Sequence, residues 1–336
     1  MPGPVDPNRR IRIHIKNNRA GDEVFRITPE RYAEAAARHP RIAARVDPVI
    51  DWDLDNFESS MRVAEVFVGW DLPTEDLGRR APRLRWIHVI GAGVEHLLPL
   101  DWLPPGVRLI NNRGVHAPKA GEFGLMAVLM LNNAIPALAT RQRARRYDPI
   151  YSTPARGKTL VIVGLGRMGG AVARQAKRLG LHVIGVRRHG RAARHADETV
   201  GPEGLDDALA RADFVLVTLP LTPETRGLFD RRRLDRMKPT AGLVNMGRAA
   251  VVDHAALADK LREGSLAGAV LDVHEPEPLP ASSPLWTTPN LIVTPHVSSD
   301  DVESYIPLTL DLLFDNLARD LAGRPLRNRV RPRLGY

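Results

Sequence analysis

One segment carries the strongest structural signal in the chain: Leu160-Val161-Ile162-Val163-Gly164-Leu165-Gly166-Arg167-Met168-Gly169-Gly170-Ala171-Val172-Ala173. An apolar strand is predicted before the glycines and a helix after them. In this G-x-G-x-x-G pattern, Gly164 permits a tight turn, Gly166 lets the backbone approach a pyrophosphate, and Gly169 lets the helix pack closely on the strand. The start of the helix then offers free N–H groups to phosphates. The segment therefore predicts dinucleotide binding, although a glycine-rich turn in another α/β protein would look similar.

The next predicted strand, 182–186, bears on which dinucleotide is bound. An NAD site usually has Asp or Glu at the end of this strand, about 20 residues after the glycines, where it binds the ribose hydroxyls. Here the strand is followed by Arg187 and Arg188. Two arginines suit a 2′-phosphate, so NADP(H) is the favoured cofactor and NAD(H) is possible. The alternative is that an arginine-rich composition placed them there by chance.

Strands and helices alternate on both sides of this segment, which predicts parallel sheets with crossover helices. After the glycine-rich loop, the predicted strands are 182–186, 213–218, 242–245, 268–271 and 291–293. Before it, an earlier α/β unit has predicted strands at 11–15, 63–68, 84–90 and 107–110, and predicted helices at 29–38 and 73–80. A long apolar helix, 121–131 extending toward 139 with a kink at Pro136, lies between the two units, and the last helix is predicted at 301–322.

The length of 336 residues fits about two domains. With 43% hydrophobic and 26% charged residues, the composition is that of a globular chain, not of a disordered or fibrous one. The most apolar stretch, 124–139, is shorter than the roughly 20 residues that span a bilayer, so no membrane span is expected. The first ten residues, MPGPVDPNRR, contain no apolar h-region, so no signal peptide is expected. The absence of cysteine excludes disulfides and Cys-ligated zinc, and it fits a cytoplasmic location.

The formal net charge of +9 comes from 48 basic and 39 acidic residues. Nearly all the basic residues are arginines, which bind carboxylates and phosphates through a bidentate fork. The arginine clusters at 141–146 and 324–333 have no interleaved aromatic residues, and no zinc-finger or RNA-recognition signature is present. Nucleic acid is therefore not expected as a partner, and genome composition is the simpler explanation of the arginine bias.

Three further segments predict chemistry, because each follows an apolar strand: 245–248, 272–278 and 294–299. Ligands bind at the carboxyl ends of parallel strands, so side chains from these segments could meet at one site. They offer Arg248, a carboxylate from Glu275 or Glu277, and His296. Hydride transfer from a hydroxy acid needs a cation for the substrate carboxylate, a base for the hydroxyl proton and a carboxylate that holds the base.

Taken in order, the glycine fingerprint, the run Leu219-Pro220-Leu221-Thr222-Pro223-Glu224-Thr225 and these three segments form one pattern. The chain resembles the D-2-hydroxyacid dehydrogenases, the family of glyoxylate/hydroxypyruvate reductases and phosphoglycerate dehydrogenases, over nearly its whole length. The resemblance implies that Arg248 is the catalytic arginine and also binds substrate, that Glu277 is the catalytic carboxylate, and that His296 is the acid/base. Glu275 is then a solvated loop residue.

The resemblance also implies the remaining contacts of the site. The expected cofactor-binding residues, besides Arg187 and Arg188, are Gly164, Gly166, Arg167, Met168, Gly169, Leu219, Pro220, Thr225, Met246, Gly247 and Asp272, the last at the nicotinamide carboxamide. Ala92 and Gly93 are expected to bind the substrate carboxylate through backbone N–H groups, and Ser299 to lie near the substrate. No metal site is expected.

The implied architecture is α/β, with two Rossmann-like or flavodoxin-like parallel-sheet domains and a cleft between them. Both chain ends, 1–118 and 300–336, form the substrate (catalytic) domain, and 119–299 form the dinucleotide-binding Rossmann domain. The family is usually dimeric through the cofactor domain, so a cytoplasmic homodimer is expected. Three departures from the family pattern, Tyr147, Ala249 and Ser298, leave the identity of the substrate open.

The leading hypothesis is an NAD(P)-dependent D-2-hydroxyacid dehydrogenase that works as a reductase of small 2-oxo acids such as glyoxylate or hydroxypyruvate. The main alternative is a cofactor-sensing binding protein or corepressor without catalytic activity, because the same fold can serve different functions. A third hypothesis is oxidation of formate or phosphite. Glu277 argues against formate, since the formate enzymes typically have Gln at that place, but it does not exclude phosphite.

Overall fold

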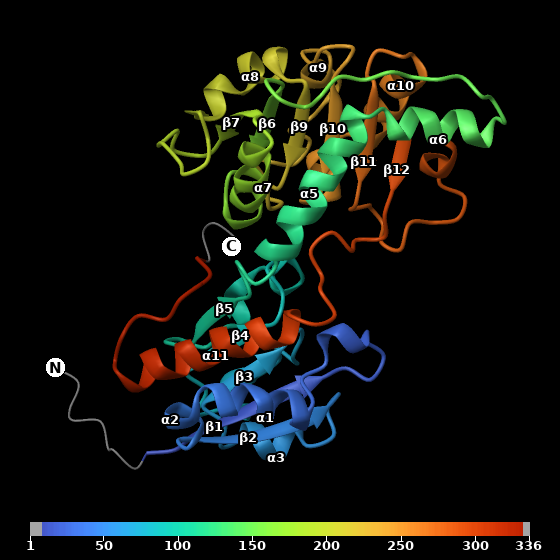
Figure 1. The fold of residues 1–336 in the computed structure, drawn as a ribbon. Helices are drawn as coiled ribbons and strands as arrows, with labels where there is room; N and C mark the ends of the chain where they lie inside the picture. Colours follow the sequence, from blue (N-terminus) through green and yellow to red (C-terminus); the bar gives the residue numbers. More distant parts are fainter. Residues whose placement is uncertain (1–8, 332–336) are drawn as a thin grey trace. The chain divides into compact units, whose positions relative to one another are not determined.

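The computed structural model describes residues 9–331, and the chain forms two compact units. Unit 1 is Met1–His116 with Asp301–Tyr336, and unit 2 is Ala117–Asp300. Each unit is built on one parallel sheet with helices packed on both faces (Figure 1). The α/β class predicted from the sequence is therefore confirmed.

Unit 1 has five strands in the order β2-β1-β3-β4-β5, which is the flavodoxin-like order. The strands are β1 (Ile11–Asn17), β2 (Val46–Trp52), β3 (Val66–Gly69), β4 (Trp86–Val89) and β5 (Arg108–Asn111). The helices are α1 (Pro29–Arg38), α2 (Pro40–Ala43), α3 (Phe57–Met61), α4 (Leu77–Arg80) and α11 (Tyr305–Leu321), with 3-10 turns at Glu23–Phe25, Glu95–Leu97 and Leu100–Trp102.

The C-terminal helix α11 completes the core of unit 1. Its buried side chains, including Leu310 and Phe314, pack with α1 against one face of the sheet, and Phe57 and Leu77 from α3 and α4 belong to the core on the other face. Helix α1 begins where the sequence predicts, because Pro29 occupies its first turn and the Thr28 hydroxyl accepts from the backbone N–H of Arg31.

Unit 2 has seven strands in the order β12-β11-β10-β9-β6-β7-β8. They are β6 (Thr159–Val163), β7 (His182–Val186), β8 (Glu198–Val200), β9 (Phe214–Val217), β10 (Gly242–Asn245), β11 (Gly268–Leu271) and β12 (Leu291–Val293). The helices are α5 (Ala117–Asn132), α6 (Ile135–Arg143), α7 (Arg167–Arg178), α8 (Leu205–Arg211), α9 (Arg231–Leu234) and α10 (His254–Arg262), with 3-10 turns at Pro202–Gly204, Ala249–Val251 and Pro284–Thr287. The order reverses between β6 and β9, which is the switch point where such sheets bind ligands.

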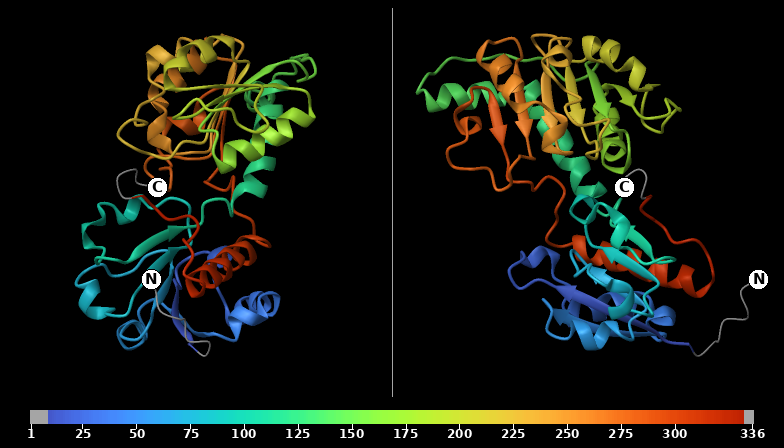
Figure 2. Two further views of the ribbon diagram at one scale, coloured as in Figure 1. Left: turned by 90° about the vertical axis from the view of Figure 1, so that its left-hand side faces the viewer. Right: turned by 180° about the vertical axis from the view of Figure 1, so that it is seen from behind.

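Helices α5 and α7 cover one face of the unit 2 sheet, and α8 and α10 cover the other (Figure 2). The two apolar layers that they form with the strands explain why the central strands are apolar along their whole length. All seven strands are parallel, so their carboxyl ends share one edge. This edge carries the residues considered below.

Several elements differ from the sequence predictions, among them the short helices α2 and α3 of unit 1, which were not predicted. Strands β2 and β8 were not predicted, and both lie at sheet edges, where side chains need not alternate between core and solvent. The long helix predicted with a kink at Pro136 is two helices, because Ala134 is left-handed (φ 52°) and Pro136 falls in the first turn of α6, where proline is tolerated. Among the described residues no single helix is long and apolar enough to cross a membrane; α5 and α6 reach that length only as a pair bent by 65°.

Candidate active site

The glycine-rich loop joins β6 to α7 at the switch point of unit 2. Gly164 has φ +104°, and a Cβ there would lie 2.9 Å from the carbonyl carbon of Thr218, so only glycine fits. The Thr218 hydroxyl donates to the Gly164 carbonyl at 2.7 Å, which ties the loop to the end of β9. A Cβ on Gly169 would lie 2.6 Å from the same carbonyl oxygen, so this glycine brings α7 close to the strand.

Gly166 differs from the other two glycines. A Cβ there would meet no protein atom nearer than 3.9 Å, so packing within the protein does not require glycine at this position. The open space lies at the start of α7, where Gly166 is the residue before the first turn and backbone N–H groups have no partner within the helix. A pyrophosphate fits this arrangement, because it needs both close approach to the backbone and N–H donors.

Arg187 and Arg188 follow β7 and are both exposed. Hydrogen bonding from Thr222 lowers the pKa of Glu224, and the nearby charge of Arg188 lowers it further. Arg188 is therefore close to the turn that follows β9, on the other side of the switch point. The two segments that flank the glycine loop thus lie near each other at the switch point.

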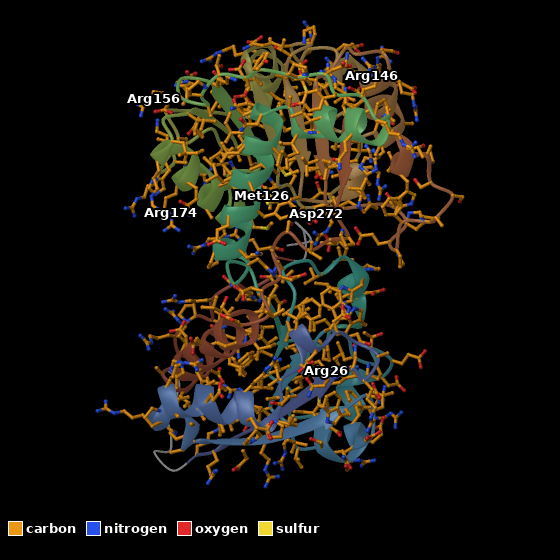
Figure 3. All side chains as sticks on the ribbon, turned by 45° about the vertical axis from the view of Figure 1, so that its right-hand side comes forward. Arg26, Met126, Arg146, Arg156, Arg174 and Asp272 are labelled. Carbon is orange, nitrogen blue, oxygen red and sulfur yellow. The ribbon has the colours of Figure 1, made fainter. Side chains whose placement is uncertain are left out.

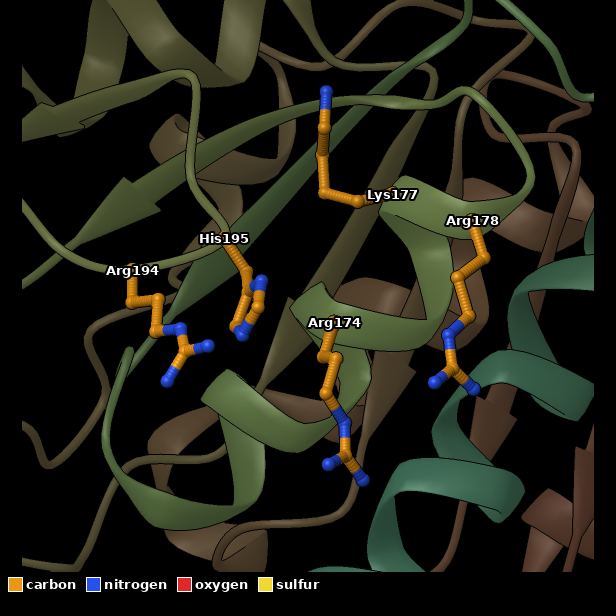
Figure 4. A pocket seen from close by; sticks show the side chains of 5 residues that line it. All are labelled: Arg174, Lys177, Arg178, Arg194 and His195. Atoms are coloured by element: carbon orange, nitrogen blue, oxygen red, sulfur yellow. The ribbon is translucent and has the colours of Figure 1, made fainter.

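A basic pocket lies along α7 (Figure 4). It is lined by Arg174, Lys177, Arg178, Arg194 and His195. Lys177 Nζ is bonded to both carboxylate oxygens of Asp197, at 2.7 and 2.8 Å, so its charge is balanced. Arg174 is about 10 Å along the helix axis from Arg167, which separates the pocket from the phosphate-binding end of α7. The sequence analysis did not single out this cluster.

The other predicted cofactor residues of unit 2 lie in the loops after β6, β9 and β10, and several of them shape these loops. Thr225 Oγ1 accepts from the Thr222 N–H and donates to the Pro220 carbonyl, both at 2.8 Å, so it fixes the turn after β9. The Met246 side chain is buried in the core, so only its backbone is available to a ligand at this edge. Leu219 and Pro220 are partly exposed, as is Met168, whereas Arg167 is fully on the surface.

Arg248 follows β10 in a turn held by Asn245. The Asn245 side chain accepts from the Gly247 N–H at 3.1 Å and donates to the Arg248 carbonyl at 3.1 Å. Gly247 lies against Leu219, whose carbonyl oxygen would be 2.7 Å from a Cβ at that position. The Arg248 side chain is half-buried, and its Nη1 donates to the Gly247 carbonyl at 2.8 Å. The turn therefore presents a guanidinium at the edge of the sheet.

His296 and Glu277 form the central contact of the site. His296 Nδ1 lies 2.8 Å from Glu277 Oε2, and the other carboxylate oxygen accepts from the backbone N–H of His274 at 2.8 Å. Burial alone would raise the pKa of Glu277, but these two hydrogen bonds outweigh it and hold the pKa below its ordinary value. Of the two candidate carboxylates, the one that contacts His296 is thus Glu277, and the carboxylate stays charged at neutral pH.

Asp272 braces the loop that carries His296. Asp272, labelled in Figure 3, directly follows β11 and is completely buried. Its carboxylate accepts from the Thr294 hydroxyl at 2.6 Å and from the backbone N–H groups of Val297 and Ser298 at 3.0 Å each. His296 has φ +54°, a left-handed conformation that is uncommon outside glycine. The brace therefore holds the histidine in a conformation that directs Nδ1 to Glu277.

These contacts of Asp272 were not foreseen from the sequence, which assigned it only to the nicotinamide. Within the part of the chain that the structure describes, one carboxylate oxygen, Oδ2, accepts from Ser298 N–H alone and so keeps capacity for one more donor. Ser299 is partly exposed next to this brace. Within residues 9–331, no three His, Asp or Glu side chains gather in a way that could hold a metal ion.

Ala92 and Gly93 belong to unit 1, in the loop after β4. A Cβ on the residue before them, Gly91, would lie 2.2 Å from the Trp70 ring, so any side chain there would have to displace that ring. Trp70 in turn stacks on His96 at a ring distance of 4.0 Å. Among the described residues, the backbone N–H groups of Ala92 and Gly93 donate to no protein acceptor, so both can bind an anion.

Comparison with known proteins agrees with this geometry. The family model for "D-isomer specific 2-hydroxyacid dehydrogenase, NAD binding domain" matches residues 125–298. The chain is 34% identical to glyoxylate/hydroxypyruvate reductase B of Pectobacterium carotovorum over 300 residues, which cover 84% of this chain and 91% of that protein. It is 35% identical to D-3-phosphoglycerate dehydrogenase of Mycobacterium bovis over 226 residues, which cover 67% of this chain but only 43% of that longer protein.

A solved structure extends the likeness to both units. The D-isomer specific 2-hydroxyacid dehydrogenase of Xanthobacter autotrophicus Py2, crystallised with NADPH and MES, superposes with a TM-score of 0.83 at 32% identity. The match covers 96% of this chain and 99% of that one.

Proposed function

Because the chain belongs to the D-2-hydroxyacid dehydrogenase family, an NAD(P)-dependent group of oxidoreductases that act on CH–OH groups, we propose that it reduces small 2-oxo acids at Arg248, Glu277 and His296. The observation that carries the proposal is the contact between His296 Nδ1 and Glu277 Oε2. It leaves Nε2 of the imidazole for the substrate and places a carboxylate against Nδ1, where it holds the ring in position.

The chemistry divides between the cofactor and the chain. The nicotinamide, when bound, supplies the hydride. His296 gives its Nε2 proton to the keto oxygen as the carbonyl carbon is reduced, and Glu277 stabilises the imidazolium before that transfer. Arg248 binds the substrate carboxylate and polarises the carbonyl. Unit 1 is the substrate domain in this proposal, and the N–H groups of Ala92 and Gly93 are its proposed donors to a substrate carboxylate.

We propose glyoxylate and hydroxypyruvate as the substrates. The support is the extent of the similarity. The match covers 91% of glyoxylate/hydroxypyruvate reductase B but only 43% of the phosphoglycerate dehydrogenase. The test is the rate of NADPH and NADH oxidation with glyoxylate, hydroxypyruvate, pyruvate and larger 2-oxo acids. Turnover of only the larger acids would overturn this choice of substrate, and no turnover at all would overturn the proposed reaction.

Removing the charge of Glu277 should slow reduction. In Glu277→Gln the imidazole loses the carboxylate partner of Nδ1, and the amide that replaces it carries no negative charge beside the ring during proton transfer. The expected result is a lower kcat for glyoxylate reduction. Glu275→Gln is the matched control and should keep the wild-type rate. The reverse outcome, a loss of rate in Glu275→Gln and none in Glu277→Gln, would assign the role to Glu275.

We propose NADP(H) as the favoured cofactor. The segment after β7 carries Arg187 and Arg188 and no carboxylate that would repel a 2′-phosphate. The basic pocket along α7 adds positive charge to the same unit and favours the more anionic cofactor through long-range attraction. The similar Xanthobacter structure contains NADPH.

The expected preference of the wild type for NADPH over NADH is about tenfold or more in kcat/KM, because one charge-assisted hydrogen bond contributes about 1.5–3 kcal/mol. Arg187→Ala/Arg188→Ala should lose this preference. Arg178→Ala, an exposed arginine on α7 that donates to Gln175, is the control and should keep most of it. Equal use of both cofactors by the wild type, or an undiminished preference in the double variant, would contradict the assignment.

We also propose that the protein is a cytoplasmic homodimer that associates through unit 2. Large apolar side chains are exposed on α5, on α6 and in the loop after α6, including Met126, Ile135, Tyr147 and Tyr151. Exposed apolar residues that gather on neighbouring elements are typical of a subunit interface. The absence of cysteine fits a reducing compartment.

A further inference from the structure

Two consecutive asparagines at the end of β5 hold the loop that contains Ala92 and Gly93. The Asn112 side chain donates to the Ile90 carbonyl at 2.7 Å, and the Asn112 backbone N–H donates to the Gly91 carbonyl at 2.9 Å. The Asn111 side chain donates to the Ala92 carbonyl at 2.7 Å. Three consecutive carbonyls of the loop are thus bonded to one pair of residues, which an extended strand cannot achieve because its carbonyls alternate in direction.

Because the peptide group is planar, fixing the carbonyls of the loop also fixes the direction of its N–H groups. In a trans peptide the carbonyl of one residue and the N–H of the next point in opposite directions. Since the Gly91 and Ala92 carbonyls point toward the asparagines, the N–H groups of Ala92 and Gly93 point away from them. These are the two N–H groups that have no protein acceptor among the described residues.

Buried neighbours fix the orientation of the Asn112 amide. His88 Nε2 lies 2.8 Å from Asn112 Oδ1, and because that oxygen can only accept, the imidazole must donate from Nε2. Burial lowers the pKa of His88 to about 4, so the ring is neutral at neutral pH. The amide nitrogen of Asn112 also donates to the Thr309 hydroxyl at 2.8 Å. With its oxygen directed to His88, the amide can present only its NH₂ group to the loop.

The C-terminal helix takes part in the same network. Tyr305 on α11 donates its hydroxyl to the Ile90 carbonyl, and the Thr309 hydroxyl donates to the Tyr305 carbonyl at 2.8 Å. His88, Asn112 and Thr309 are completely buried, and Asn111 is 1% exposed. Their polar atoms bond to the loop and to one another, so their effect on a ligand must pass through the loop.

We propose that Asn111 and Asn112 are positioning residues for the substrate carboxylate. They hold the loop so that the N–H groups of Ala92 and Gly93 point toward that carboxylate. The inference rests on the proposed function, because it takes that loop as the carboxylate site. Carboxylate binding is shared by the ground state and the transition state, so loosening the loop raises KM more than it lowers kcat. The cofactor, which is bound by unit 2, is unaffected.

The test compares Asn111→Ala and Asn112→Asp with the wild type. KM for glyoxylate should rise about fivefold to tenfold in Asn111→Ala, which loses one hydrogen bond to the loop. The inhibition constant of oxalate, a carboxylate that does not react, should rise by the same factor. The dissociation constant for NADPH and the pH profile should not change, because neither Glu277 nor His296 is altered. Asn112→Asp should raise KM further, since its carboxylate would lie against the Ile90 carbonyl and repel that oxygen. If Asn112→Asp does not fold, Asn111→Ala alone decides the test.

The matched control is Asn316→Ala. Asn316 is a completely buried asparagine on α11 that holds the backbone of Arg327 and makes no contact with the loop. It should lower the melting temperature while leaving KM for glyoxylate unchanged. The positioning role is overturned if the wild type is active and the KM of Asn111→Ala for glyoxylate lies within twofold of the wild-type value. It is also overturned if KM rises as much in Asn316→Ala as in Asn111→Ala. A wild type that reduces no 2-oxo acid overturns the proposed function instead, and oxalate binding to the NADPH complex then still tests the loop.

Discussion

His296→Ala is expected to lower kcat for glyoxylate reduction by about 10²–10⁴-fold, the usual contribution of a positioned general acid. The variant removes the proton donor and leaves the glycine loop, Arg187 and Arg188 intact. The dissociation constant for NADPH, measured by fluorescence titration, should therefore stay within about twofold of the wild type, since no binding group is lost. Loss of activity with cofactor binding retained identifies a chemical role rather than damage to the fold.

His182 provides the matched control. It forms a second His–carboxylate pair in unit 2, with Nε2 2.8 Å from Glu198 Oε1, but it is the first residue of β7 and so lies at the amino edge of the sheet. His182→Ala should retain wild-type kinetics. If His296→Ala keeps more than half of the wild-type rate, the site has been assigned to the wrong histidine.

Arg248→Lys is expected to lower kcat/KM by about tenfold to a hundredfold although the positive charge is kept. A guanidinium binds a carboxylate with two parallel hydrogen bonds, whereas an ammonium is a point charge that cannot reproduce this geometry. The loss of one charge-assisted bond, about 1.5–3 kcal/mol, accounts for a factor of this size. The decrease should appear with every 2-oxo acid, because all of them present the same carboxylate.

Arg211→Lys controls for the loss of a bidentate arginine elsewhere. Arg211 binds both oxygens of Glu198, with Nη1 2.8 Å from Oε2, on the surface of unit 2. This substitution should leave kcat/KM unchanged, since exposed pairs contribute little and the pair takes no part in catalysis. A fully active Arg248→Lys enzyme would show that Arg248 has only a structural role.

Five predicted strands of unit 2 have their predicted bounds in the structure: 159–163, 182–186, 242–245, 268–271 and 291–293. The first four are mainly apolar and buried along nearly their whole length, which is the pattern that a sequence shows most clearly. Strand β2, by contrast, contains Asp47 and Pro48 and is partly exposed at an edge, where the pattern of burial no longer constrains the sequence. Strand β8 consists of Glu198, Thr199 and Val200, all partly exposed, so it lacks the apolar run that made the equally short β12 predictable.

Motifs indicated the candidate residues of the site, but not the hydrogen-bond network that supports them. Glycine spacing and the Arg, Glu and His that follow apolar strands are visible in the sequence, because each lies within a few residues of a strand end. The contacts of Asp272 join it to a loop more than 20 residues away, and Asn112 joins a loop to Thr309 on the last helix. Neither set of contacts can be predicted from neighbouring residues in the sequence, because the partners come together only when the sheet and the helices around it have formed.

The central claim is that the chain transfers a hydride to a 2-oxo acid and does not merely sense a cofactor. The most direct measurement incubates the wild type with hydroxypyruvate and NADPH that carries two deuterium atoms at nicotinamide C4, followed by mass and chiral analysis of the product. The expected result is D-glycerate with one deuterium at C2 for each molecule of NADPH consumed. Binding of NADPH without any transfer of deuterium, to hydroxypyruvate or to glyoxylate, would contradict the claim and support a cofactor-binding protein without catalytic activity.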